Sequence, residues 1–163
     1  MDSTIRAMTE ADANPVSAIV AADYRLLAVY DGFTPEQLHR LLAERCTADY
    51  LREGWLTRWD CYVAESSTRI LGAVAIDGNE IAELWVAPEC HRQGIGSALF
   101  RYAEQRMWEA GHRQLTLHCA TMSAQPFYLA MGCDVVDVRP CSGGPLEGRP
   151  ITCYRKKLER FDE

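Results

Sequence analysis

Residues 93–100 are Gln93-Gly94-Ile95-Gly96-Ser97-Ala98-Leu99-Phe100, and they separate a strand-like run from a long amphipathic run. The strand-like run spans Ile81 to Val86, and the amphipathic run starts near Ser97. Backbone N–H groups at a helix N-terminus have no intrahelical acceptor, and the positive end of the helix dipole lies there. Glycine at 94 and 96 lets the backbone turn tightly and approach a ligand closely. The stretch therefore predicts a strand, a glycine turn and a helix start that together bind an anion such as a phosphate.

Two common classes of phosphate site do not match this stretch. A nucleotide-hydrolysing P-loop carries Lys and then Ser or Thr after its last glycine, and no such pair follows Gly96. A dinucleotide fingerprint would need a small residue at Leu99 and an acidic residue at the end of the next strand, where Leu115-Thr116-Leu117-His118 has none. The glycine pair alone is equally typical of an ordinary turn before a helix, so the neighbouring residues decide the assignment.

Two longer segments carry a family resemblance. Residues 84–99, Leu-Trp-Val-Ala-Pro-Glu-Cys-His-Arg-Gln-Gly-Ile-Gly-Ser-Ala-Leu, resemble the acetyl-CoA-binding segment of the GNAT superfamily of N-acetyltransferases. Residues 124–133, Ala-Gln-Pro-Phe-Tyr-Leu-Ala-Met-Gly-Cys, resemble a later segment of the same family. His91 replaces the family's usual Arg or Gln, and Cys133 replaces its usual Phe. The resemblance is close over residues 60–158 and implies acetyl transfer from acetyl-CoA, without a metal.

Hydrophobic periodicity and turn signals predict a single α/β domain, a sheet flanked by helices, over residues 1–163. Strands are expected at Ile5–Met8, Asp60–Glu65, Ile70–Asp77, Glu80–Val86, Leu115–Cys119, Cys133–Val138 and Ile151–Leu158. Helices are expected at Glu10–Ala22 after a Thr9 cap, from Thr34-Pro35 to Arg45, at Ala48–Glu53, from about Ser97 to Ala110 and at Ser123–Met131. The resemblance implies the GNAT fold, a mixed, mostly antiparallel sheet whose central parallel strands splay apart.

The helix after the glycine turn shows a clear apolar stripe. Ile95, Leu99, Ala103 and Met107 recur at helical spacing, so this face is expected to pack against the sheet. Three charged residues are expected on the opposite face, in solvent: Arg101, Glu104 and Glu109. Gly111 is expected to end the helix.

Composition favours a soluble enzyme of the cytoplasm. The net charge of −6 argues against nucleic acid as the main partner, because a phosphate backbone requires a basic face. The sequence contains no apolar run near the length of a membrane span and no charged leader, so no membrane partner is expected. Seven scattered cysteines, none in a Cys-x-x-Cys pair, predict neither a disulfide framework nor a zinc site. Cys90 and Cys119 lie near the expected cleft without a readable histidine partner.

Amine acetylation requires a base, and the strand before the glycine turn carries two candidates. A primary amine with a pKa near ~10.4 is mostly protonated at neutral pH, so a carboxylate must remove its proton, directly or through water. Similar enzymes often place a glutamate on this strand, and here Glu80 and Glu83 both lie on it. Strict alternation puts them on opposite faces unless a bulge intervenes. Glu83 is favoured because it lies mid-strand, and an ordinary solvated glutamate is the alternative for each.

The resemblance also implies the other site residues. Tyr128 matches the family's tyrosine near the thioester sulfur, where it assists the leaving thiolate; a core tyrosine is the alternative. The backbone of Leu84, Trp85 and Val86 would bind the pantetheine arm and acetyl carbonyl. The amides of Gln93, Gly94, Ile95, Gly96 and Ser97 would hold the pyrophosphate. Arg92 would add charge near an adenosine phosphate or face solvent, and Thr121 and Ser123 would contact the cofactor or simply cap a helix.

The acceptor stays open at this stage. In similar enzymes the first two helices and the last hairpin grip it, here roughly Tyr24 to Trp59 and a glycine-rich loop from Pro140 to Pro150 that is expected to be mobile. Aromatic residues in the first region offer a pocket or ordinary core packing: Tyr24, Tyr30, Phe33, Tyr50, Trp55 and Trp59. A small-molecule amine, a peptide N-terminus and a lysine remain possible acceptors, and a homodimer is compatible with the resemblance. A non-catalytic acyl-CoA-binding or regulatory module is the alternative function.

Overall fold

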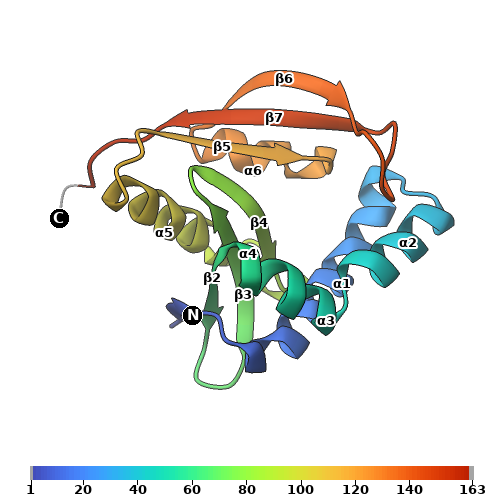
Figure 1. Cartoon of the computed structure of the whole chain (residues 1–163), viewed down its shortest axis with the longest axis horizontal. Coiled ribbons are helices and arrows are strands. Elements are labelled where there is room, and N and C mark those ends of the chain that lie inside the picture. Colours follow the sequence, from blue (N-terminus) through green and yellow to red (C-terminus); the bar gives the residue numbers. More distant parts are fainter. Residues whose placement is uncertain (1, 162–163) are drawn as a thin grey trace.

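The computed structural model describes residues 2–161 and shows a seven-stranded sheet with helices packed against it (Figure 1). The strands are β1 (Thr4–Ala7), β2 (Asp60–Glu65), β3 (Ile70–Asp77), β4 (Glu80–Val86), β5 (Gln114–Cys119), β6 (Asp134–Pro140) and β7 (Pro150–Lys157). The helices are α1 (Ala13–Asp31), α2 (Pro35–Arg45), α3 (Ala48–Tyr50), α4 (Leu56–Arg58), α5 (Ile95–Glu109) and α6 (Gln125–Ala130). The predicted α/β class is confirmed.

Elements with strong local signals lie where the sequence predicts them. The strands β2, β3 and β4 have the predicted bounds, and α2 begins and ends as expected. Thr34 caps α2 through a reciprocal pair: Gln37 N donates to Thr34 Oγ1 at 3.1 Å, and Thr34 N donates to Gln37 Oε1 at 2.9 Å. Each of these signals joins residues only a few positions apart.

The first helix is longer than predicted. A 3₁₀ turn at Glu10–Asp12 leads into α1, which continues past the predicted end at Ala22 to Asp31. The extension arises because no glycine or proline lies between Ala22 and Gly32, whose φ of +65° ends the helix. The third predicted helix also continues past Glu53, as a π-helical turn over Leu51–Trp55 followed by α4.

The sheet is antiparallel except at its centre. The strand order is β1-β2-β3-β4-β5-β7-β6, and the β4–β5 pair is parallel. The two strands pair only at Glu80 with Thr116 and Ile81 with Leu117, and then separate. In Figure 1, the strands β5, β7 and β6 run in a clearly different direction from β2, β3 and β4. The expected splay of the central parallel strands is thereby confirmed.

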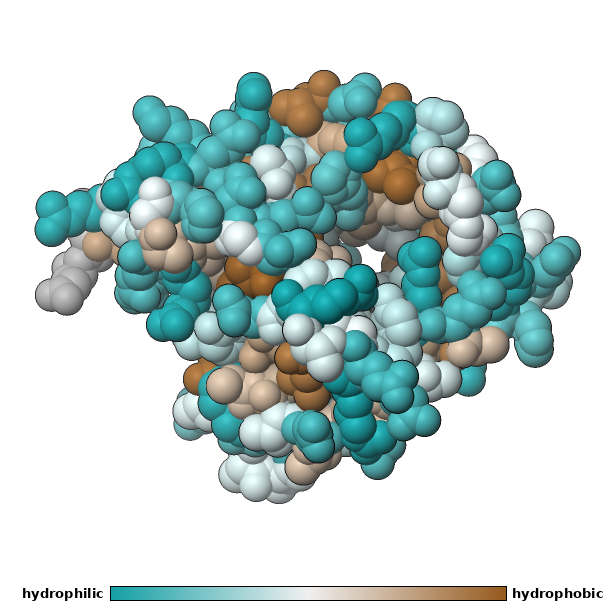
Figure 2. Space-filling model, in the orientation of Figure 1, coloured by the Kyte–Doolittle hydropathy of each residue, from teal (hydrophilic) through white to brown (hydrophobic). Residues whose placement is uncertain are grey.

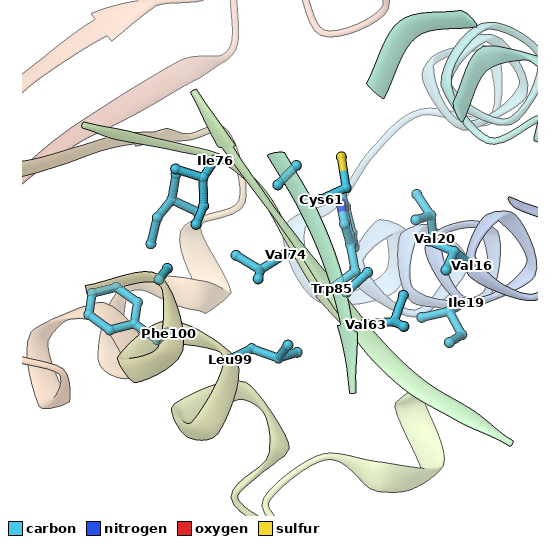
Figure 3. Close-up of a cluster of buried hydrophobic side chains, with 14 of the residues drawn as sticks. Val16, Ile19, Val20, Cys61, Val63, Val74, Ile76, Trp85, Leu99 and Phe100 are labelled. Atoms are coloured by element: carbon cyan, nitrogen blue, oxygen red, sulfur yellow. The ribbon is translucent and has the colours of Figure 1, made fainter. Parts of the chain in front are cut away.

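The core lies on both faces of the first half of the sheet. Figure 3 shows Val74 and Ile76 of β3 on the side of α5, and Val63 of β2 and Trp85 of β4 on the side of α1. The α5 side chains Leu99 and Phe100 and the α1 side chains Val16 and Val20 are at most 1% exposed. Burial of this apolar area stabilises the frame that holds β4 in place.

One prediction for α5 is wrong. Glu104 does not face solvent but is 5% exposed and forms an ion pair with Lys156 of β7. The Lys156 ammonium also lies 5.5 Å from the centroid of the Phe100 ring. A charge on the apolar side of a helix is tolerated here because its partner comes from a strand far along the chain, which helical periodicity cannot show.

No helix within residues 2–161 combines the length and the apolar character needed to cross a membrane.

Candidate active site

A cavity of about 1080 Å³ opens where β4 and β5 separate. Its walls come from α1, the last residue of α2, β4, the β4–α5 segment, β5, α6 and the segment between β6 and β7. Figure 2 shows a hollow near the middle of this face, between β7 and α1. Strand separation creates this space, so residues on both free strand edges reach it.

The N-terminus of α5 forms one end of the cavity. Gly94 is the N-cap with a φ of +85°, and Ala98 N donates to Gly94 O at 3.0 Å. The N–H groups before Ala98 therefore have no acceptor within the helix. Gly94, Gly96 and Ser97 line the cavity together with Arg92, whose φ of +62° is unusual for a residue with a side chain. This arrangement can bind an anion.

Two of the five predicted amide donors are set back from the cavity. The side chain of Ile95 is 3% exposed in the core, and that of Gln93 donates to the preceding turn at 3.1 Å. Within residues 2–161 neither is among the lining residues. At Gly96, a Cβ would lie 3.4 Å from the Phe127 ring and 3.5 Å from Val86. A Cβ at this position would already be in van der Waals contact with this wall, which leaves little room for a larger side chain.

The backbone of β4 forms the floor of the cavity. Leu84, Trp85 and Val86 all line it, beyond the last β4–β5 pair at Ile81. Their register with β3 continues, so only the edge toward β5 is without a partner strand. His91 Nε2 lies 3.1 Å from Val86 O and can donate to it. The edge before Val86 can therefore pair with an extended, peptide-like ligand.

The two glutamates have different environments. The β3–β4 register shifts between Glu83 and Ile81, so a bulge interrupts the alternation that separates Glu80 from Glu83. Glu83 lines the cavity, and Trp85 Nε1 donates to its Oε2 at 2.6 Å. Glu80 is not among the lining residues of the described chain, and its Oε1 lies 3.5 Å from His118 Nδ1.

Burial sets the acidity of Glu83. It raises the pKa of this carboxyl to about 7, while the Trp85 hydrogen bond and the charges of Arg45 and Arg58 oppose the rise. A carboxyl that titrates near neutral pH can accept a proton in its ionised form and release it again. Glu83 is thus placed and tuned for acid–base chemistry.

Tyr128 lies on α6 and also lines the cavity. Its ring is 8% exposed and packs against Phe127 and Tyr154, with centroid distances of 5.2 and 5.1 Å. Burial raises the pKa of the Tyr128 phenol well above its usual value. The hydroxyl therefore stays protonated and can donate a hydrogen bond into the cavity.

The capping role expected for Thr121 and Ser123 is wrong, although both residues line the cavity. Thr121 Oγ1 lies 2.9 Å from the Cys119 sulfur and makes no capping hydrogen bond. Ser123 donates through Oγ and N to Asp31 at 2.8 and 2.9 Å, so the last residue of α1 satisfies the N–H group. An acidic residue at a helix C-terminus interacts unfavourably with the helix dipole. The position of Asp31 at the end of α1 was therefore a signal in the sequence that it binds a group outside that helix.

Both cysteines near the cleft line the cavity, and all seven cysteines are unpaired. Burial raises the pKa of the Cys119 thiol, while its contacts with Thr121 oppose the rise. Such a thiol is a poor nucleophile at neutral pH because its thiolate is disfavoured.

The other end of the cavity comes from segments far apart in the chain. Tyr24 and Tyr30 of α1 and Arg45 of α2 meet Leu146 from the β6–β7 segment and Ile151 of β7. Among the other aromatic candidates, Phe33 and Trp55 are buried, whereas Tyr50 and Trp59 pack at the edge of the core. Sequence reasoning missed Arg45 and Leu146, for which no local pattern gives a signal.

The β6–β7 segment is fastened to the helices. The Arg149 guanidinium lies 4.7 Å from the Phe33 ring centroid, and its Nη1 donates to Gly32 O at 3.4 Å. Arg40 of α2 donates to Gly144 O, also at 3.4 Å. These contacts hold a segment that the sequence predicts to be mobile against the helices that complete the cavity.

Asp23 joins the two ends of the cavity. It lies on α1, is 8% exposed, and its Oδ1 lies 3.2 Å from His91 Nε2 in the β4–α5 segment. Burial raises the pKa of Asp23 to about 6, and the charge of His91 opposes the rise. Neither residue was singled out for this contact in the sequence, because 68 positions of chain separate them.

Comparison with known proteins agrees with this architecture. A family model described as an acetyltransferase (GNAT) domain matches residues 29–144. The peptidyl-lysine N-acetyltransferase YiaC of Escherichia coli (strain K12) is 35% identical over 88 residues, which are 53% of this chain and 58% of that relative. The chain therefore matches little more than half the length of YiaC.

Two solved structures share the fold. A GCN5-related N-acetyltransferase from Rhodopseudomonas palustris has a TM-score of 0.81 at 20% identity, covering 97% of each chain. The PaiA N-acetyltransferase from Thermoplasma acidophilum, in complex with coenzyme A, has a TM-score of 0.79 at 19% identity and covers 96% of this chain and 99% of its own. At this level of identity the likeness concerns the fold.

Proposed function

The chain belongs to the GNAT acetyltransferase family, and from that premise we propose that it transfers the acetyl group of acetyl-CoA directly to an amine bound in the same cavity. One observation carries the proposal. The N-terminus of α5, the free edge of β4, Glu83 and Tyr128 all line one continuous space. A ternary complex needs such a space, because donor and acceptor must be held together for direct attack.

The cofactor end fits acetyl-CoA group by group. Gly94, Gly96 and Ser97 line the cavity at the start of α5, so their amides would hold the pyrophosphate, with Gln93 and Ile95 completing the turn. Arg92 adds a positive charge beside it. The free edge of Leu84 and Trp85 would pair with the pantetheine amides, and Thr121 and Ser123 lie across the cavity from that edge, on the β5 side. The coenzyme A complex of PaiA supports this assignment for the family.

Glu83 would act as the base. It takes the proton of the acceptor ammonium, directly or through a water, and the free amine attacks the thioester carbonyl. The new C–N bond forms, the C–S bond breaks, and the thiolate of CoA leaves and takes up the second proton that the attacking nitrogen loses. We favour Glu83 over Glu80 because, of these two residues, Glu83 is the one that lines the cavity.

Tyr128 would stabilise the leaving thiolate by donating a hydrogen bond. A phenol with an ordinary pKa near ~10 is a weaker acid than a thiol at ~8.5, so full proton transfer is uphill by roughly 2 kcal/mol. The raised pKa of Tyr128 widens this gap. Hydrogen-bond stabilisation of the developing charge is therefore its main contribution.

Cofactor specificity is the first test. A thermal-shift titration compares acetyl-CoA and CoA with ATP and NAD. A ligand at 100 times its Kd adds about 2.7 kcal/mol to the free energy of unfolding, or roughly 5 to 10 °C at this chain length. We expect shifts with the two CoA species alone. No shift with either would remove the α5 N-terminus as a cofactor site.

Turnover then tests the base. With a broad amine panel we expect acetyl-CoA-dependent thiol release whose rate rises with pH through about 7, as Glu83 loses its proton. Glu83→Gln should lower kcat about 10- to 100-fold and abolish this rise. Glu80→Gln, on the same strand but outside the cavity lining, is the matched control. An unchanged pH–rate profile for Glu83→Gln would reject the assignment, and tight binding without turnover would favour a non-catalytic CoA-binding module.

A further inference from the structure

The acceptor end of the cavity contains a cation with no protein partner. Arg45 is the last residue of α2, is half-buried and lines the cavity. Two other arginines of this region, Arg40 and Arg149, bind backbone carbonyls. Within residues 2–161, Arg45 has neither a hydrogen-bond acceptor nor an ion-pair partner. A ligand anion at this place could accept charge-assisted hydrogen bonds from a guanidinium that no protein group in the described chain occupies.

The Arg45 guanidinium lies close to the β6–β7 segment. A Cβ built on Gly144, in the β6–β7 segment, would lie 3.0 Å from Arg45 Nη2. The segment is itself held against α1 and α2 by Arg149 and Arg40. The guanidinium therefore lies between α2 and this segment, beside the acceptor end of the cavity.

The same cavity contains the carboxylate that would face the amine. Glu83 lies on the β4 floor, and the charge of Arg45 lowers the pKa of Glu83 against the effect of burial. The lining of this cavity also includes apolar and aromatic side chains: Leu27, Tyr30, Leu146 and Ile151. A ligand that matches this end therefore has an ammonium at one point, an anion at another and an apolar body between them.

We propose that the acceptor is a small amine that also carries an anionic group, a carboxylate or a phosphate, and that Arg45 binds this group while the amine faces Glu83. This inference rests on the proposed function and deepens it. The planar guanidinium can bind either anion through two parallel hydrogen bonds. A lysine side chain of a protein lacks an anion at the required position, so a peptide acceptor is the competing outcome.

Matched acceptors test the proposal at saturating acetyl-CoA. L-phenylalanine is compared with L-phenylalaninamide and 2-phenylethylamine, L-leucine with L-leucinamide, and phosphoethanolamine with ethanolamine. We expect the anionic member of at least one set to have a kcat/KM about 10- to 100-fold higher than its neutral partners, mainly through KM. The carboxylate and phosphate sets distinguish the two anions. Amidation lowers the basicity of the amine, so without a contact to the carboxylate the amide would be the better substrate.

Variants at two arginines locate the contact. Arg45→Gln should abolish the preference for the anionic member and leave the affinity for acetyl-CoA unchanged. Because loss of the Arg45 charge also raises the pKa of Glu83 and so changes the rate with every amine, the preference is measured as the ratio of kcat/KM values within each variant at one pH. Arg45→Lys keeps the charge and should restore part of the preference. Arg25→Gln is the control, because Arg25 is an exposed arginine of α1 that lies outside the cavity lining in the described chain. Equal kcat/KM values for the anionic and neutral members of every set, with no change of this ratio in Arg45→Gln, would overturn the inference. Faster acetylation of a lysine-containing peptide than of these small amines would also overturn it. If the unsubstituted protein turned over none of these amines, that result would instead contradict the proposed function.

Discussion

The two ends of the cavity are built in different ways. The cofactor end is nearly continuous in sequence, since β4, the glycine turn and the start of α5 supply it from residues 84–97. The acceptor end combines α1 and α2 with the β6–β7 segment, and the bond from Arg149 to Gly32 that helps to close it spans 117 positions. The proposed cofactor site is thus encoded by neighbouring residues, whereas the proposed acceptor site depends on contacts that only the folded chain makes.

A change confined to the cofactor end should produce the largest effect. Gly96→Val places a branched side chain against the Phe127 ring and across the amides of the α5 N-terminus. We expect the Kd for acetyl-CoA, measured by calorimetry, to rise more than about 100-fold, because the pyrophosphate can no longer approach the backbone.

Gly78→Ala is the control for Gly96→Val. Gly78 lies in the β3–β4 turn with a φ of +61°, and a Cβ there meets nothing within 4 Å. Backbone strain of about 1 kcal/mol should lower Tm and leave the Kd for acetyl-CoA unchanged. An unchanged Kd for acetyl-CoA in Gly96→Val would show that the cofactor does not bind at the N-terminus of α5.

A substitution at Tyr128, between the cofactor and the acceptor ends, should lower kcat more than it weakens the binding of either substrate. Tyr128→Phe removes the hydrogen-bond donor that faces the leaving sulfur in the proposed mechanism. We expect kcat to fall about 10- to 100-fold and the Kd for acetyl-CoA to stay within about twofold. Tyr154→Phe is the matched control, because its ring packs 5.1 Å from Tyr128 but lies outside the cavity lining in the described chain. An unchanged rate would remove Tyr128 from the mechanism.

The sequence was informative where the signal is local. The hairpin β3–β4 and the capped helix α2 lie at their predicted bounds because alternation, a turn glycine and a cap each involve neighbouring residues. The glycine turn before α5 is local in the same sense. It was found because Gly94, which has a positive φ, and the helix start that follows it leave a pattern that does not depend on the rest of the fold.

The failures are contacts between distant residues. Periodicity placed Glu104 in solvent because Lys156 lies 52 positions away, and Ser123 was expected to cap a helix because Asp31 lies 92 positions away. Arg45 carried no signal at all, since only the splay of the sheet and the fastened β6–β7 segment bring it to the cavity. Among these residues Arg45 belongs to the acceptor end, where the sequence also left the substrate open.

The smallest effect is expected at the contact that links the two ends. Asp23 on α1 meets His91 beside the glycine turn, and burial raises the pKa of Asp23 to about 6 from an ordinary 3.8. Between pH about 4 and 6 the folded chain holds a proton that the unfolded chain releases, so this carboxyl lowers the stability of the fold as the pH rises. Asp23→Asn keeps the shape and removes the charge. It should raise the free energy of unfolding in urea by about 1 to 2 kcal/mol at pH 8 and change it little near pH 4.

Binding measurements separate this stability effect from a role in either end. Asp23→Asn should change the Kd for acetyl-CoA and the KM for the amine by no more than about twofold, because the proposed pyrophosphate and amine contacts use other groups. Asp134→Asn, on the exposed strand β6, is the control and should show no pH-dependent gain. A large rise in both constants with Asp23→Asn would mean that the Asp23–His91 contact aligns the two ends for catalysis. The cofactor end would then depend on the acceptor end through this contact, although its own residues are neighbours in the sequence.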